Sequence, residues 1–415
     1  RLLTIQIPAW LCQSYQLPLY IEVMITQGIG LSLVTALSFF PILFVMFFAL
    51  HILEESGYMT RAAVVMDRLM RYCNLPGESL VALVLGLGCN VPGILATRHI
   101  PNHGDKVVTA LMMPFMSCGA RLTIFAVFSS VFFPHQAASV LMFLYVLGIS
   151  VAVFTGIIAR YIGGFEKSEA ETYLLELPAY QWPLLPVAIQ QAYNRSKRFV
   201  WRALGVIMPV CAVLAICNHI SIDGALLDTP GDQSILAFIG KCLSGLFYPI
   251  GLERHHWPLV VSLLMGLLAK EVVISTLSIF YMQMGGNVVE AGQSFSGLWQ
   301  ACGMEISENL GHWHTYFMPF MQVETPGWAL YFNQQHISTE AVMGYLIFTL
   351  LYFPCVSTLY ATARQVGWKW AGVSVLWSTV AAYMCASAYI MIQKLPWVIW
   401  EVGALIGVLL LTYGI

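Results

Sequence analysis

Long apolar runs separated by short polar segments dominate this chain. Nearly uncharged stretches long enough to cross a bilayer, which takes about 20 residues, lie at 28–52, 107–133, 138–160, 200–219, 341–363, 371–392 and 397–415. Runs of this length and uniformity predict membrane-spanning helices, whereas a helix on a soluble domain has one polar face. The pattern therefore predicts an all-α polytopic membrane protein.

Two further apolar stretches do not fit a simple crossing. Residues 80–97 are short and glycine-rich, and residues 258–281 contain an adjacent Lys-Glu pair. Lys and Arg mark cytoplasmic loops. A full crossing at 80–97 would place either the Arg98/Lys106 cluster or the Arg160/Lys167 cluster on the external side. We therefore expect both stretches to be re-entrant or otherwise interrupted, and to enter the membrane from opposite sides.

The order of these segments indicates two repeats of opposite orientation. Segments 28–52 and 200–219 each contain a proline, and each is followed by an interrupted stretch and then by a span with Pro near Cys. Paired interrupted segments in corresponding positions point to a transport site near the membrane midplane. The predicted domains are an external segment 1–27, a first repeat 28–162, a cytoplasmic connector 163–199, a second repeat 200–392 with an external loop 282–340, and a C-terminal transmembrane helix 393–415.

Composition supports the membrane class. Hydrophobic residues make up 59% and charged residues 10% of the chain, and the mean hydropathy is +0.75, far from the balance of a soluble domain. The formal charge of −2 does not indicate a nucleic-acid partner, so the expected partner is the lipid bilayer. The first residue is Arg, and we expect the sequence to be part of a longer chain.

Cysteines beside helix breakers are the strongest chemical signal. Several of the ten cysteines lie within apolar runs, where free thiols are expected rather than disulfides. Cys89, Cys118 and Cys355 lie within a few residues of Pro or Gly, and Asn90 adds an oxygen beside the first. Thiolate is a soft ligand that suits iron, zinc and cuprous ions. The alternative for each buried cysteine is a packing role.

Charged residues inside apolar runs are costly and usually functional. Glu271 is the candidate oxygen ligand, which completes a predicted metal site of Cys89, Asn90, Cys118, Glu271 and Cys355. Lys270 is expected to neutralise a carbonyl end or an acid. Arg121 would repel a cation, so we expect it to hold the carboxyl end of a broken helix or an acid such as Glu54 or Glu55. A solvated helix terminus is the alternative role for the acids.

Five short motifs follow one another along nearly the whole chain. They are Leu53-Glu-Glu-Ser-Gly-Tyr-Met-Thr-Arg-Ala-Ala-Val-Val-Met-Asp-Arg, Gly88-Cys-Asn-Val-Pro, Met113-Pro-Phe-Met-Ser-Cys-Gly-Ala-Arg, Ala269-Lys-Glu-Val-Val and Tyr352-Phe-Pro-Cys-Val-Ser. Together they resemble the membrane domain of FeoB, the bacterial ferrous iron transport protein B. The resemblance implies two Gate-type repeats in the cell inner membrane, import of Fe2+ as the transported substrate, and pathway thiols at Cys89, Cys118 and Cys355.

The same family has an N-terminal GTPase domain, an associated helical domain and a first membrane helix, which we expect to lie outside the present sequence. GTP and Mg2+ would then act only through that missing part, and this part is expected to be a transporter rather than an enzyme. The resemblance also implies small cytoplasmic Feo accessory proteins as partners. It leaves homo-oligomerisation, and the choice between channel and alternating access, open.

Two other readings compete. Gate repeats also occur in nucleoside transporters, so a carrier for a nucleoside or another organic solute is the first alternative. Such a carrier would recognise its substrate with aromatic and amide groups. It would therefore not need Cys at three broken-helix positions. A membrane metalloenzyme or scaffold is the second alternative, but the sequence contains no H-E-x-x-H or G-x-S-x-G motif to support an enzyme.

Overall fold

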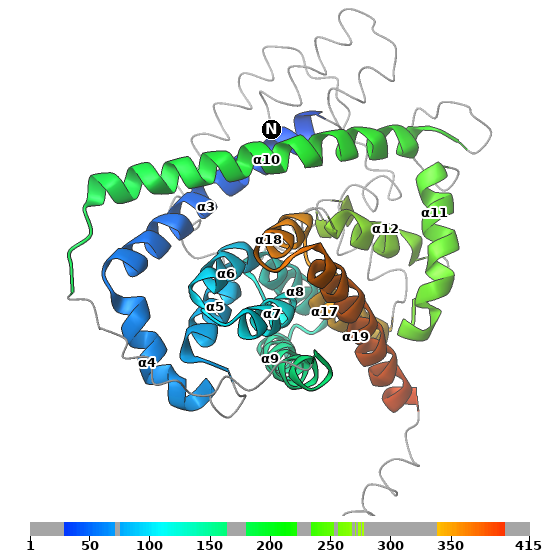
Figure 1. Cartoon of the computed structure of the whole chain (residues 1–415). Helices are drawn as coiled ribbons and strands as arrows, with labels where there is room; N and C mark the ends of the chain where they lie inside the picture. Colours follow the sequence, from blue (N-terminus) through cyan, green and yellow to red (C-terminus); the bar gives the residue numbers. More distant parts are fainter. Residues whose placement is uncertain are drawn as a thin grey trace, which may run out of the picture.

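The computed structural model describes residues 29–70, 75–163, 180–221, 234–252, 256–267 and 338–394, together with residues 270, 273, 274, 276 and 277. Within these ranges the chain is helical, and the only strand-like pairing is an isolated bridge between Ser221 and Ser234. Figure 1 shows short helices gathered at the centre, with longer ones around them. The predicted all-α class is confirmed for this part of the chain.

The first half of the described chain contains seven α-helices and two short 3-10 turns. They are α3 Leu31–Glu55, α4 Tyr58–Met70, α5 Gly77–Gly88, α6 Asn90–Ala96, η4 Thr97–His99, α7 His103–Met112, η5 Met113–Phe115, α8 Gly119–Phe132 and α9 Ala137–Gly163. The second half contains α10 Leu185–His219, α11 Ile235–Ser244, η6 Gly245–Ile250, α12 Trp257–Gly266, α17 Thr339–Leu351, α18 Val356–Val366 and α19 Trp368–Lys394.

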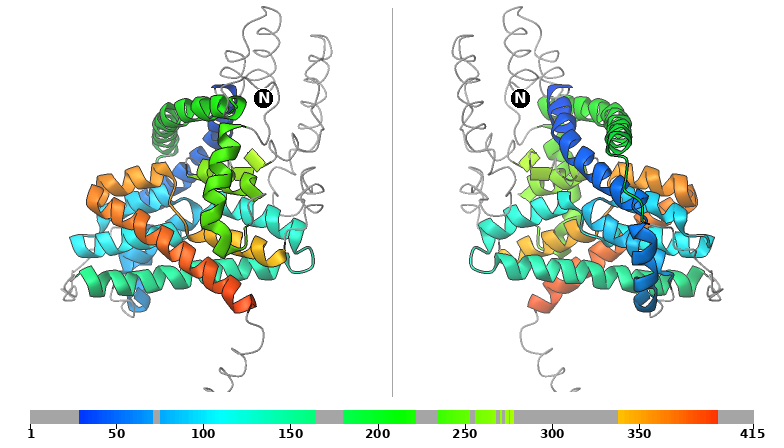
Figure 2. Two further views of the ribbon diagram at one scale, coloured as in Figure 1. Left: turned by 90° about the vertical axis from the view of Figure 1, so that its right-hand side faces the viewer. Right: turned by 90° about the vertical axis from the view of Figure 1, so that its left-hand side faces the viewer.

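Four helical stretches in the described residues are long and apolar enough to cross a membrane. Two of them, His103–Phe132 and Thr339–Val366, contain a break, and 61% and 72% of their apolar parts are buried. The unbroken stretches Ala137–Gly163 and Trp368–Gln393 are only 28% and 22% buried. The broken helices are therefore the more buried ones, and the unbroken α9 and α19 expose apolar side chains, as expected beside lipid. Figure 2 shows α9 along one edge of the bundle.

The interruption predicted at 80–97 is confirmed, and it is a hairpin. α5 ends at Gly88, α6 begins at Asn90, and α6 packs back along α5. A Cβ built on Gly93 would lie 2.9 Å from the carbonyl oxygen of Ala82 and 3.0 Å from the Cα of Gly86. Only a glycine permits so close an approach of the two backbones. In the second stretch, α12 ends at Gly266 and most of the residues up to 281 lie outside the described set.

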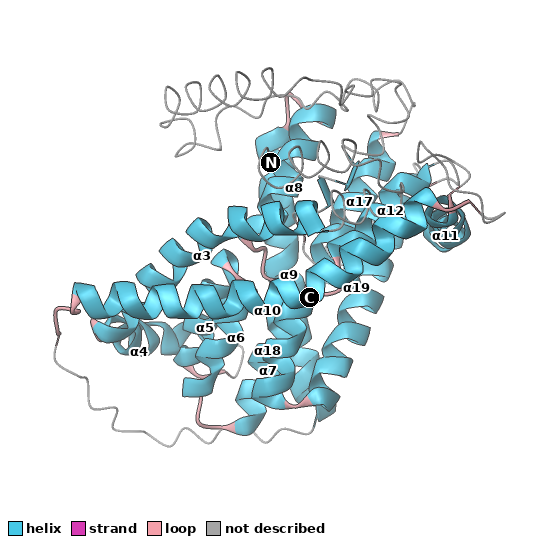
Figure 3. Ribbon diagram, turned by 90° about the horizontal axis from the view of Figure 1, so that it is seen from above, coloured by secondary structure: helices cyan, strands magenta, loops and turns pink. Residues whose placement is uncertain are grey.

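Helices α3 and α10 lie side by side across one side of the bundle (Figure 3). The ring centroids of Phe40 and Tyr193 are 5.9 Å apart in an edge-to-face contact. α10 begins at Leu185, although the sequence placed residues up to 199 in a connector. Its first turns alternate buried alanines, Ala188 and Ala192, with exposed polar residues, so this amphipathic segment lacks the uniform hydropathy by which the spans were recognised.

Several expectations fall outside the described residues. They are the external segment 1–27, nearly all of the loop 282–340 and the C-terminal helix 393–415 except its first two residues. The opposite orientation of the two repeats stays a prediction.

The hairpin gives a test of packing. Gly93→Ala should lower the free energy of unfolding by about 1–3 kcal/mol, because its methyl group would press on backbone atoms that cannot move aside. Gly88→Ala is the matched control, since a Cβ there meets nothing within 4 Å in the described structure. Thermal unfolding in detergent measures both variants. Equal stability of the two would show that the hairpin is not packed as described.

Candidate metal pathway at the helix breaks

Each of the three cysteines predicted as metal ligands lies at a helix break, directly before a new helix. Cys89, Cys118 and Cys355 are the N-cap residues of α6, α8 and α18, with extended backbone angles (φ/ψ −156/131, −79/163 and −60/154°). None of the three forms a disulfide, and each residue is only partly buried. The Cys355 thiol lies 3.0 Å from the Thr358 hydroxyl, within hydrogen-bond distance. Extended residues interrupt the helical hydrogen-bond ladder, so backbone carbonyls next to each thiol need other partners.

The breaks lie close to one another. A Cβ built on Gly119, the neighbour of Cys118, would lie 3.7 Å from the carbonyl oxygen of Gly88, the neighbour of Cys89. Arg121, three residues after Cys118, donates to the carbonyl oxygen of Tyr352, three residues before Cys355, at 3.2 Å. The fold therefore brings together three helix breaks, each with a cysteine, that lie in separate parts of the sequence.

Arg121 joins the breaks of the two broken spans. Its side chain is 1% exposed. One terminal nitrogen donates to the carbonyl oxygens of Pro114 and, at 3.3 Å, Met116, while the other donates to that of Tyr352 at 3.2 Å. The prediction that Arg121 holds a broken-helix carboxyl end is confirmed, and it holds two such ends at once.

The acids suggested as partners of Arg121 pair elsewhere. Glu54 lies 3.9 Å from Arg98 and 3.4 Å from Arg195, and Glu55 lies 3.1 Å from His51. The expectation that Glu54 or Glu55 pairs with Arg121 is therefore wrong. Both terminal nitrogens of the Arg121 guanidinium donate instead to carbonyl oxygens freed at the breaks.

Lys270 caps the second break. Its ammonium donates to the carbonyl oxygen of Phe353 at 3.0 Å and lies 3.2 Å from the ring centroid of Tyr352. The Tyr352 hydroxyl in turn donates to the carbonyl oxygen of Leu263 at 3.1 Å, which ties the break to α12. The expectation that Lys270 neutralises a carbonyl end is confirmed.

Two buried oxygens near the thiols have no hydrogen-bond partner within the described part of the chain. They are Oδ1 of Asn90, whose residue is 5% exposed, and Oγ of Ser117, whose residue is 2% exposed. Buried polar atoms are rarely left unpaired, so both oxygens suit a ligand or water. Ser117 was not among the predicted site residues. The signal that could have found it is a hydroxyl directly before Cys118 in an otherwise apolar motif.

The described residues contain no group of three or more His, Cys, Asp or Glu placed to hold a metal ion. Of the predicted ligands, Cys89, Asn90, Cys118 and Cys355 lie at the breaks, and Glu271 falls outside the described residues. The set of five as metal ligands stays a prediction. What the described residues offer is dispersed thiols, an amide oxygen and a hydroxyl, not a closed cage.

Comparison with known proteins agrees with this architecture. The profile of the Gate family, described as nucleoside recognition, matches residues 36–132 and 200–369, which is more than half of the chain. The chain is thus a Gate-domain membrane protein. A second profile, that of the ferrous iron transport protein B C terminus, matches residues 141–195.

Curated relatives identify the family more specifically than the Gate profile does. The chain is 38% identical over 389 residues to the Fe(2+) transporter FeoB of Legionella pneumophila (strain Lens), and 36% identical over 402 residues to the FeoB of Salmonella typhimurium. These matches cover 91% and 92% of this chain but 51% and 50% of the relatives, so the chain spans about half of their length. No solved structure matches it. The chain belongs to the FeoB family.

Removal of the Arg121 guanidinium should destabilise the whole bundle. Arg121→Gln is expected to lower the free energy of unfolding by roughly 3 kcal/mol, because buried carbonyls at two breaks lose their donors. Lys197→Gln, an exposed cation on α10, is the control and should change little. Denaturant unfolding in detergent gives both values. If Arg121→Gln were as stable as the control, the guanidinium would not hold the breaks together.

Proposed function

We propose that this chain is the permease part of a ferrous iron importer, embedded as a multi-pass protein in the bacterial inner membrane. The observation that carries the proposal is that three partly buried cysteines stand at helix breaks, two of which Arg121 links. The names of the relatives, Fe(2+) transporter FeoB, support the same substrate.

The chemistry of the breaks suits a transported ferrous ion. Fe2+ lies between hard and soft metals and accepts both sulfur and oxygen ligands. A pathway needs sites that bind the ion enough to dehydrate it yet release it again. Dispersed thiols with the amide oxygen of Asn90 meet that need better than a closed thiolate cage would. A thiol that binds the ion loses its proton on binding.

The cations near the breaks have a positioning role in this proposal. Arg121 and Lys270 donate hydrogen bonds to the freed carbonyl oxygens. The thiols, rather than these carbonyls, would then bind the ion. Glu271 would add a carboxylate from the second repeat. We place the two repeats at 28–162 and 200–392, joined by the connector 163–199.

The energy source is proposed to lie outside this chain. GTP and Mg2+ would act through the other half of the full-length relatives, and the present part would have no enzymatic activity of its own. Small cytoplasmic Feo proteins as partners, and a homo-oligomer, belong to the same proposal.

A nucleoside carrier is the second candidate, because the matched Gate family is described as nucleoside recognition. The two candidates differ in what the thiols do. A nucleoside carrier would retain its transport without them, whereas an iron permease would not.

Thiol substitution separates these candidates. Cys89→Ser, Cys118→Ser and Cys355→Ser should each lower Fe2+ uptake into proteoliposomes under reducing conditions by about tenfold, as one lost ligand is worth at least that factor. Cys242→Ser, at an exposed thiol on α11, is the matched control. Full uptake by all three variants, or thiol-independent uptake of a nucleoside, would contradict the proposal.

Glu271 gives an independent test. Glu271→Gln should reduce Fe2+ uptake while the protein still inserts, because the amide keeps the shape but loses the charge that attracts the ion. Glu271→Ala combined with Cys89→Ser should be little worse than the stronger single change, since residues that act on one ion are not additive. Wild-type uptake by a correctly inserted Glu271→Gln protein would return this acid to a structural role.

A further inference from the structure

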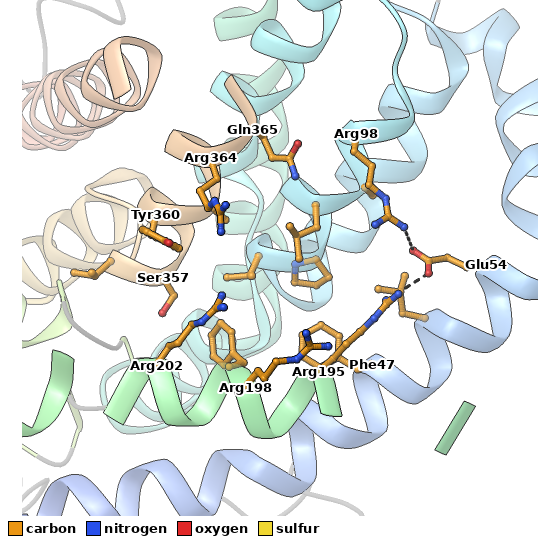
Figure 4. A pocket seen from close by; sticks show the side chains of 18 residues that line it. Phe47, Glu54, Arg98, Arg195, Arg198, Arg202, Ser357, Tyr360, Arg364 and Gln365 are labelled. Atoms are coloured by element: carbon orange, nitrogen blue, oxygen red, sulfur yellow. Dashed lines mark hydrogen bonds and ion pairs between the residues drawn. The ribbon is translucent and has the colours of Figure 1, made fainter. Parts of the chain in front are cut away.

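A separate cavity adjoins the helix breaks. It has a volume of about 880 Å³ and lies between α3, α6, α10 and α18 (Figure 4). Its walls include Val91, which follows Asn90, and Val356, which follows Cys355, but none of the candidate metal ligands. A volume of this size is in the range of sites for small organic ligands.

Arginines dominate the polar lining of this cavity. Figure 4 shows their side chains reaching toward the cavity from three elements: η4, α10 and α18. The single lining carboxylate belongs to Glu54, and no lysine lines the cavity. The five arginines are Arg98, Arg195, Arg198, Arg202 and Arg364.

Glu54 neutralises only part of this charge. It pairs with Arg98 and Arg195, whereas Arg198, Arg202 and Arg364 have no ion-pair partner among the described residues. Burial, together with the Arg98 guanidinium, lowers the pKa of His99 against the opposing effect of Glu54, so this neighbouring ring is neutral at pH 7. Several guanidinium groups that face one cavity repel each other, and a bound anion removes that repulsion.

The choice of arginine indicates the chemistry of the anion. The guanidinium fork matches the oxygens of phosphate in bidentate fashion, which lysine does not. The rest of the wall is mostly apolar and includes Phe47, Leu50, Leu95 and Phe199, with polar groups from Ser357, Tyr360 and Gln365. A small inorganic ion would leave this apolar surface in water, so the lining favours a phosphate group attached to an organic body.

The surroundings of the cavity suit the headgroup level of a membrane. α10 carries three of the arginines, and the same helix leaves Ile189, Tyr193 and Trp201 exposed, while Trp182 just before it is 97% exposed. Exposed Trp and Tyr of membrane proteins collect at the membrane–water interface. Basic pockets between helices at that level are typical binding sites for anionic headgroups.

We propose that this arginine cavity binds a phosphate-bearing anion, supplied either by the headgroup of an anionic phospholipid or by a soluble organic phosphate. The site goes beyond iron transport and does not rest on it. Its chemistry is set by Arg198, Arg202 and Arg364, none of which belongs to the thiol pathway.

Native mass spectrometry of the purified chain in detergent tests both sources. One arm adds phosphatidylglycerol or cardiolipin, with phosphatidylethanolamine as the zwitterionic reference, and the other adds ATP without metal. The double variant Arg198→Gln/Arg202→Gln should bind the preferred anion at least about tenfold more weakly, since it loses two charge-assisted contacts. The matched control Lys197→Gln/Lys369→Gln removes the same charge at exposed positions outside the cavity.

The outcomes distinguish the lipid headgroup from the soluble phosphate, and they also test the proposal itself. Selective loss of anionic lipid binding in the double variant assigns the site to a headgroup, and selective loss of ATP binding assigns it to a soluble phosphate. Arg364→Gln on α18 provides a second, single variant if the double variant does not fold. Equal losses in the double variant and in the control would overturn the proposal. So would binding of an acidic peptide, such as polyglutamate, by a cavity that accepts neither phosphate source.

Discussion

One buried guanidinium holds the centre of this protein together. Arg121 donates to carbonyls at the break of the first broken span and to the Tyr352 carbonyl at the break of the second. A break inside a membrane frees carbonyls that hydrocarbon cannot satisfy. The broken helices are therefore stable only where such donors reach them. Cys89, Cys118 and Cys355 stand at these breaks as N-cap residues.

The same constraint explains the other polar contacts of the centre. Lys270 satisfies the Phe353 carbonyl, and the backbone N–H of Val356 donates to the carbonyl oxygen of Leu267 at 3.1 Å, so α12 is fastened to the second break. Both cations are nearly fully buried, and each donates to backbone carbonyls at a break. The partly buried cysteines and Oδ1 of Asn90, which has no hydrogen-bond partner in the described residues, lie at these breaks.

Much of this organisation was predictable because it is carried by residue types with one clear physical meaning. Pro and Gly beside Cys89, Cys118 and Cys355 marked the breaks, and the intramembrane charge of Arg121 marked a capping role. The partner of Arg121 at the second break, Tyr352, is 231 residues away. It was not predictable, because the sequence does not show which breaks meet. The early start of α10 was missed, since its amphipathic first turns have too many polar residues to resemble a span. The arginine cavity was also missed, since its lining comes from four separate helices and the intervening η4 turn.

The most direct measurement is the sulfur content of the iron coordination shell. X-ray absorption spectra of the reduced, Fe2+-loaded chain in membranes should show sulfur scatterers beside oxygen and nitrogen. The Cys89→Ser/Cys118→Ser/Cys355→Ser variant, checked for insertion, should lose the sulfur scatterers. A wild-type spectrum with oxygen and nitrogen ligands alone would contradict the account, because the thiols at the breaks would then not meet the ion.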